Sequence, residues 1–168
     1  MNEPRTGVVM TYKNIVVAVD NDVATRHVCS RALDLYKSRD AQITLVHVLQ
    51  PVALIVAPGG MGGALPIPSL SEEEQQEMIE SAKSEIAKIA AELDQKAAEP
   101  ASKSVHYRVV QSAETRVAIH EVAKQINADL IVAGSHGRHG FSLFFLGSTA
   151  SDILKDSPCD VLAVRLEG

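Results

Sequence analysis

The chain has few cysteines, no basic cluster and no long apolar run, and each absence argues against a class of protein. The two cysteines, Cys29 and Cys159, are too few for a disulfide framework and fit a reducing cytoplasm. The formal net charge is −5, and no Lys/Arg cluster is visible to attract nucleic acid. No apolar run reaches the roughly 20 residues that span a bilayer, and residues 1–14 lack the apolar segment of a secretory signal. We therefore expect a cytoplasmic protein with no nucleic-acid partner and no membrane insertion.

Common catalytic and metal-binding motifs are also missing. No Gly-x4-Gly-Lys-Ser/Thr segment is present, so the chain has no P-loop lysine to hold phosphates. It has neither the His-Ile-Gly-His type of motif found in nucleotidyltransferases nor a Ser-Gly-Gly pyrophosphatase loop. The six histidines occur at spacings that match none of the usual metal sites. We therefore assign no catalytic residue and no dedicated metal site.

The most informative segment present runs from Gly134 to Thr149, GSHGRHGFSLFFLGST. It follows the short aliphatic run 129–133, which is typical of a buried parallel strand. Its glycines allow the main chain to approach a ligand closely, and residues 150–154 after it look helical. A helix start offers free N–H groups and the positive end of the helix dipole, which favour an anion. The segment therefore predicts a phosphate-binding loop.

Short aliphatic runs alternate with helical segments along the whole chain, which favours a parallel α/β sheet covered on both faces. Strands are predicted at 15–19, 43–48, 105–110, 130–133 and 161–164, and helices at 23–38, from 71 onward, around 117–126 and at 147–155. In such a sheet, ligands bind beyond the carboxyl ends of the strands, where the strand order reverses. We expect one domain over residues 1–168, with a core at about 12–166 and a long Gly/Pro-rich loop at about 50–70.

The long helix that begins near residue 71 has a clear start signal. Ser71 and Glu74 have the spacing of a capping box, in which each side chain bonds the main chain of the other residue. Apolar residues then recur at helical spacing and predict the buried face, which consists of Ile79, Ala82, Ile86, Ile89 and Leu93.

The glycine pattern Gly-x2-Gly-x9-Gly-Ser, from Gly134 to Ser148, resembles the nucleotide loop of the universal stress protein family. The segments YKNIVVAVDND, ITLVHVLQP, IVAGSHGRHG, LGSTASDIL and SPCDVLAVR are similar to that family as well, so the resemblance spans Tyr12 to Arg165. It implies the ATP-binding branch and a Rossmann-like, five-stranded sheet with the strand order 3-2-1-4-5. In that order the strand exits at Asp20 and Gly134 are neighbours at the point where the order reverses.

The resemblance and the strand exits together assign an adenine-nucleotide site. Asp20 accepts a hydrogen bond from the adenine amino group or a ribose hydroxyl. The base lies against Ala18, Val19, Val48, Ala133 and Gly134. Gly137 and the amides after it hold the middle phosphates, Arg138 and His139 are candidates to add positive charge, and the outer phosphates bind Gly147, Ser148 and Thr149.

Two of the departures from the family pattern lie beside the expected nucleotide site. The family commonly has Asp-x-Ser where this chain has Asp20-Asn21-Asp22, and Asp22 is open to two interpretations, a helix N-cap or a ligand for a divalent cation. Thr149 stands where the family often has Val, and its hydroxyl is an additional group for a phosphate contact. A Mg²⁺ ion carried by the nucleotide phosphates is compatible with either interpretation.

The resulting hypothesis is a stress-response regulator that binds ATP or AMP and orders its loops for a protein partner. The alternative is a slow Mg²⁺-dependent ATPase or a protein that phosphorylates itself at Ser148 or Thr149. The intact glycine motif argues against a third possibility, an interaction module that works without nucleotide. By resemblance, and because an unpaired strand edge favours pairing, we expect a homodimer formed through residues 160–165.

Overall fold

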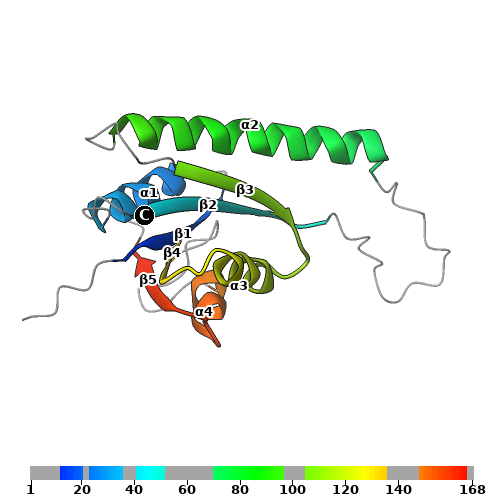
Figure 1. The fold of residues 1–168 in the computed structure, drawn as a ribbon. Coiled ribbons are helices and arrows are strands. Elements are labelled where there is room, and N and C mark those ends of the chain that lie inside the picture. Colours follow the sequence, from blue (N-terminus) through cyan, green and yellow to red (C-terminus); the bar gives the residue numbers. More distant parts are fainter. Residues whose placement is uncertain are drawn as a thin grey trace, which may run out of the picture.

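A computed structural model describes residues 12–20, 23–35, 41–51, 70–96, 105–135 and 148–165 (Figure 1). The strands are β1 (Asn14–Val19), β2 (Gln42–Leu49), β3 (Val105–Gln111), β4 (Leu130–Gly134) and β5 (Asp160–Val164). The helices are α1 (Val23–Leu35), α2 (Glu72–Lys96), α3 (Thr115–Gln125) and α4 (Ser148–Leu154). The predicted strands are confirmed to within one residue at each end. Most of the predicted loop at 50–70, the cap at Asp22 and the end of the first helix at Ser38 lie outside the described residues.

The five strands form one parallel sheet in the order β3-β2-β1-β4-β5, which confirms the predicted fold. The central strand β1 pairs with β2 as far as Val19↔His47 and with β4 as far as Val17↔Val132. From β1 the chain builds the sheet outward through β2 and β3, and it then returns to add β4 and β5 on the other side. The strand order therefore reverses between β1 and β4, where open α/β sheets bind ligands.

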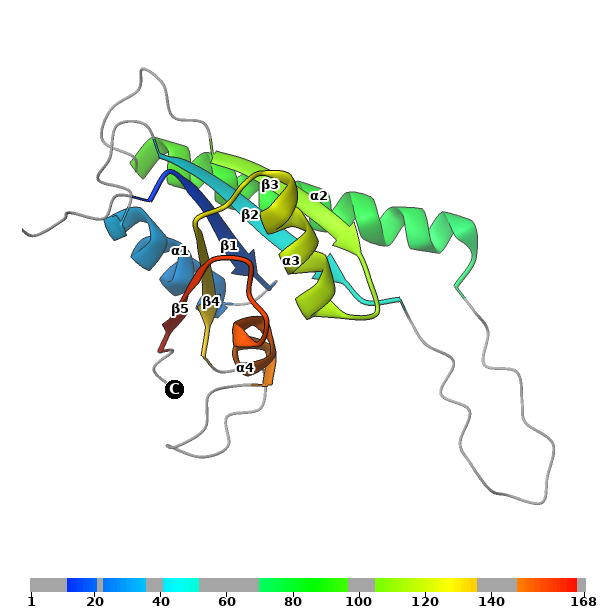
Figure 2. The same ribbon diagram turned by 60° about the horizontal axis from the view of Figure 1, so that its bottom comes forward.

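Helices cover both faces of the sheet: α1 and α2 lie on one face, and α3 and α4 lie on the other (Figures 1 and 2). Successive side chains of a strand point to opposite faces, so each strand contributes to two cores. In β1, Val17 packs on the α1/α2 side and Val16 packs on the α3/α4 side. Leu45 and Val46 divide in the same way in β2. This double burial explains why the strands are continuously apolar.

The side chain of Asp129 ties the amino ends of β1 and β4 together. One carboxylate oxygen accepts a hydrogen bond from the Lys13 amide at 2.7 Å, and the other accepts from the Asn14 amide at 3.0 Å. The two central strands are therefore held in register before they reach the edge where they end.

Helix α2 begins at the predicted capping box. The Ser71 amide donates to Glu74 Oε2 at 2.7 Å, and the Glu74 amide donates to Ser71 Oγ at 3.2 Å. Residues 71–78 are exposed, and Figures 1 and 2 show that the first turns of α2 extend beyond the sheet. Of the predicted face, Ile79 and Ile89 are only partly buried. The buried residues of α2 are Ala82, Ile86, Ala90 and Leu93.

The two cysteines are separate. Cys29 is 1% exposed and belongs to the α1/α2 core. Cys159 is partly buried against the α3/α4 core, and both thiols are free. None of the helices in the described part of the chain is long and apolar enough to cross a bilayer.

Candidate functional site

At the carboxyl edge of the sheet, three predicted site residues share one face. The side chains of Ala18, Val48 and Ala133 all belong to the α3/α4 side and come from three adjacent strands, β1, β2 and β4. Ala133 is buried, whereas Ala18 and Val48 are partly exposed. Asp20 follows β1 and is exposed, and Gly134 ends β4 and is half-buried. The sheet edge thus combines a small apolar wall with a carboxylate.

The side chain of Val19 lies apart from this wall. It is 7% exposed and packs in the α1/α2 core, on the opposite face of the sheet from Ala18. The alternation of side chains along a strand makes this separation unavoidable. Val19 therefore has only its main chain to offer to a ligand on the α3/α4 side.

The predicted phosphate-binding residues are only partly described. Gly137, Arg138, His139 and Gly147 lie outside the described residues. Helix α4 begins at Ser148, and the Thr149 side chain is exposed in its first turn.

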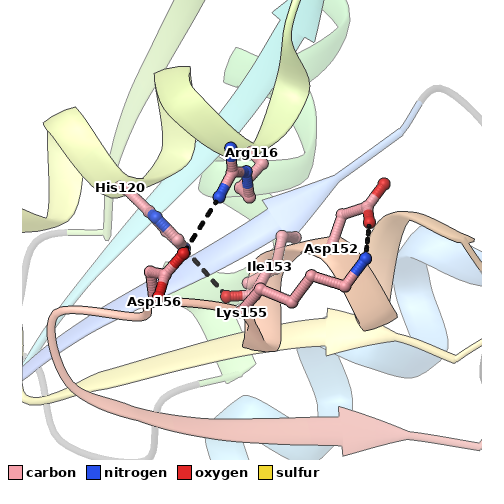
Figure 3. A network of polar contacts seen from close by, with 6 residues as sticks. All are labelled: Arg116, His120, Asp152, Ile153, Lys155 and Asp156. Carbon is pink, nitrogen blue, oxygen red and sulfur yellow. Dashed lines mark hydrogen bonds and ion pairs between the residues drawn. The ribbon is translucent and has the colours of Figure 1, made fainter.

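The other end of α4 is connected to α3 by polar contacts (Figure 3). The His120 ring nitrogen Nε2 lies 2.8 Å from the carbonyl oxygen of Ile153. Because a carbonyl only accepts, Nε2 carries the proton and donates. Arg116, one turn before His120 in α3, lies 3.6 Å from the carboxylate of Asp156, just beyond α4. Lys155 pairs with Asp152 at 2.8 Å, and this contact lowers the pKa of the Asp152 carboxyl.

Three further residues near the site were not assigned from the sequence. Val110 is the register partner of Val48 in β3 and packs on the same face of the sheet. His47 and Thr25 contact the main chain where β1 ends. The sequence carries one signal for His47, because strand alternation places it on the same buried face as Ile43 and Leu45. A single histidine without a metal-ligand spacing does not, however, indicate a role.

A small cavity of about 30 Å³ lies elsewhere, between α1 and α2. Its lining includes Cys29, Arg26 and Glu92 on the side of the sheet opposite the apolar wall. It has room for about one water molecule and is far below the size of a ligand pocket. Within the described ranges, no group of three or more His, Cys, Asp or Glu side chains is placed to hold a metal ion.

Residues 11–165 match the sequence profile of the universal stress protein family. The chain belongs to the universal stress protein family. Universal stress protein A homolog 2 of Coxiella burnetii is 34% identical over 158 residues, which cover 94% of this chain and 97% of the relative.

Solved structures of universal stress proteins have the same fold. The Lactobacillus plantarum protein superposes with a TM-score of 0.70 at 25% identity, covering 93% of this chain and 99% of its own. A universal stress protein in complex with cAMP has a TM-score of 0.59 at 20% identity, covering 93% and 98%. The Archaeoglobus fulgidus protein in complex with dAMP has a TM-score of 0.58 at 22% identity, covering 92% and 98%.

Proposed function

We propose that this universal stress protein is a stress-response regulator that binds an adenine nucleotide, ATP or AMP, at the carboxyl edge of its sheet. The observation that carries the proposal is the placement of Ala18, Val48 and Ala133 on one face beside the exposed Asp20. An apolar wall suits the faces of a purine, and a carboxylate accepts hydrogen bonds from an amino group or a ribose hydroxyl. The site also lies where open α/β sheets bind ligands.

Two nucleotide complexes of the same fold support the choice of ligand. The nucleotides in them, cAMP and dAMP, share an adenine base and one phosphate group. The proposed site has a group for each of these two parts: the apolar wall for the base and main-chain amides for the phosphate.

For the phosphates the proposal rests on the sequence. Gly137, the amides after it, Gly147, Ser148 and Thr149 hold the phosphate tail, with Arg138 and His139 as neighbouring positive groups and Mg²⁺ accompanying the nucleotide. Bound nucleotide orders this loop and the loop at about 50–70, and a protein partner recognises the ordered surface.

Calorimetric titration of the full chain with ATP, ADP and AMP tests the proposal. We expect Asp20→Ala to weaken binding by about tenfold, because the nucleoside loses a charged acceptor. Asp34→Ala is the matched control, since Asp34 is an exposed α1 carboxylate paired with Arg31 at 3.6 Å. Absence of binding at millimolar nucleotide removes the proposal, and unchanged affinity in Asp20→Ala removes the role of Asp20.

A second pair of measurements tests the loop and the kind of function. Replacing Gly137 and Gly147 by Val adds side chains where the main chain approaches phosphate, so nucleotide binding is expected to disappear. Phosphate release is followed in the same samples. If the protein releases phosphate well above the buffer blank, and if Ser148→Ala abolishes this release, the protein is a slow ATPase and the proposed regulatory function is wrong.

A further inference from the structure

The main chain at the exit of β1 is held by two buried side chains from different elements. The His47 ring in β2 contacts the carbonyl oxygen of Val19 through Nδ1 at 3.0 Å. The Thr25 hydroxyl, in the first turn of α1, donates to the carbonyl oxygen of the next residue, Asp20. His47 is 6% exposed and Thr25 is 2% exposed. Two consecutive carbonyls are therefore fixed by side chains that solvent barely reaches.

Because both side chains are buried, water cannot readily replace these two hydrogen bonds. His47 lies on the same face of β2 as Ile43 and Leu45, so its ring is on the α1/α2 side, where an apolar side chain would need no partner. A buried polar group is costly unless it is hydrogen-bonded. Since the carbonyl of Val19 can only accept, the ring must donate from Nδ1–H.

Both contacts reach the chain from behind the proposed site. They come from the α1/α2 side, whereas the Ala18 side chain faces the α3/α4 side and Asp20 is exposed at the sheet edge. The direction in which Asp20 leaves the sheet is thus set by groups that do not line the apolar wall. A binding group fixed in advance avoids the entropic cost of being ordered by its ligand.

We propose that His47 and Thr25 are positioning residues for nucleoside recognition, which hold the exit of β1 so that Asp20 is oriented for the adenosine part of the ligand. This inference rests on the proposed function. His47 and Thr25 act through the carbonyls of Val19 and Asp20 and do not contact the nucleotide. Loss of either hydrogen bond removes a side chain that fixes the exit of β1 and allows the strand exit to move.

The molecule contains a matched control in its second buried histidine. His120 is 8% exposed and donates a ring N–H to the carbonyl of Ile153 at 2.8 Å. Its bond has the same chemistry and similar burial, but it joins α3 to the far end of α4 instead of holding β1 (Figure 3). Replacing His120 therefore shows how much of any loss in affinity comes from lower stability alone, and the remainder in the His47 variants is due to the exit of β1.

The experiment titrates the full chain with adenosine and with AMP, in conditions where urea unfolding shows each variant to be folded. We expect His47→Leu and Thr25→Val each to weaken adenosine binding by about tenfold, because the ligand would then have to order the exit of β1 when it binds. His47→Asn places an amide N–H near the position of Nδ1, and we expect it to recover most of the affinity. His120→Leu is expected to keep adenosine affinity within about twofold, as for a distant and independent site.

Three results would overturn the inference: wild-type adenosine affinity in both folded variants His47→Leu and Thr25→Val, no recovery in His47→Asn, or an equal loss in His120→Leu. Failure of the wild-type protein to bind any adenine nucleotide is a different result, because it removes the proposed function itself. The ring of His47 offers a readout that needs no ligand. Nitrogen-15 NMR is expected to show a proton on Nδ1, and a ring protonated only on Nε2 would contradict the hydrogen bond on which the inference depends.

Discussion

At the scale of single residues, burial decides the chemistry of the polar and ionisable groups in the two cores. His47 and His120 occupy sites with little solvent, and each is bonded to one main-chain carbonyl. Cys29 has no such role. Its burial raises the pKa of the thiol from 9.0 to about 12, although Lys96 acts in the opposite direction. The thiol is therefore protonated at neutral pH, and Cys29 acts as a small apolar residue.

The raised pKa of Cys29 predicts a loss of stability at alkaline pH. The folded state holds the thiol proton more tightly than the unfolded state, so the stabilisation is complete below about pH 9 and is lost as the pH rises toward 12. Urea unfolding at pH 8 to 11 should show a decline in the unfolding free energy that is shallower in Cys29→Ala. The raised pKa of Tyr12, hydrogen-bonded to Asp160, contributes to the decline in both proteins. Equal slopes in the two proteins would contradict the prediction.

At the scale of elements, α2 has two parts with different energetics. Its C-terminal part packs Ala82, Ile86, Ala90 and Leu93 against the sheet, whereas residues 71–78 are exposed. An isolated turn of helix is only marginally stable, because helices in proteins depend mainly on packing. The start of α2 therefore relies on its capping box and on the bond from the Gln75 amide to the Ser71 carbonyl at 3.0 Å.

Removing the cap should consequently act locally. Ser71→Ala is expected to cost the first turns of α2 about 1 kcal/mol, because one main-chain donor loses its partner. Amide exchange of residues 74–78 should become faster, while the midpoint of global urea unfolding stays unchanged. Ser84→Ala, at an exposed position further along α2, serves as the control. If the global free energy of unfolding fell by the full cost of the lost cap, the first turns of α2 would fold together with the core.

At the scale of the whole molecule, β5 is an edge strand of the described sheet. The Ser135 amide donates to the carbonyl of Val164 at 2.7 Å, so Val164 directs its main-chain groups toward β4. Main-chain groups of successive residues in a strand alternate in direction, and those of the exposed Ala163 consequently point away from β4. An edge with free N–H and C=O groups can pair with a second copy of the chain. We propose that the homodimer forms there.

A proline tests the proposed dimer without disturbing the pairing of β5 with β4. Ala163→Pro removes the outward N–H at the edge, where proline is tolerated in strands, and we expect a monomer by light scattering after size-exclusion chromatography. Ala163→Ser keeps the N–H and should remain dimeric. A monomeric wild-type protein, or a dimeric Ala163→Pro variant, would contradict dimerisation through β5.

Much of the fold was accessible from the sequence because its strongest signals are local. Continuous apolar runs mark strands buried on both faces, and the capping box at Ser71 needs only four consecutive residues. The order of the strands and the neighbouring exits of β1 and β4 came from the family resemblance. Of the candidate site, Asp20 and Gly134 were placed at the ends of their strands from the apolar runs that precede them.

The sequence by itself determined the strands, the helix starts and the family, because these depend on the order of residue types along the chain. Only the tertiary structure decided which side chains meet across strands. It brought Val110 beside Val48 and placed the His47 ring on the carbonyl of Val19. Such contacts join residues that are distant in sequence, and their partners are fixed by strand register and by the face to which each side chain points.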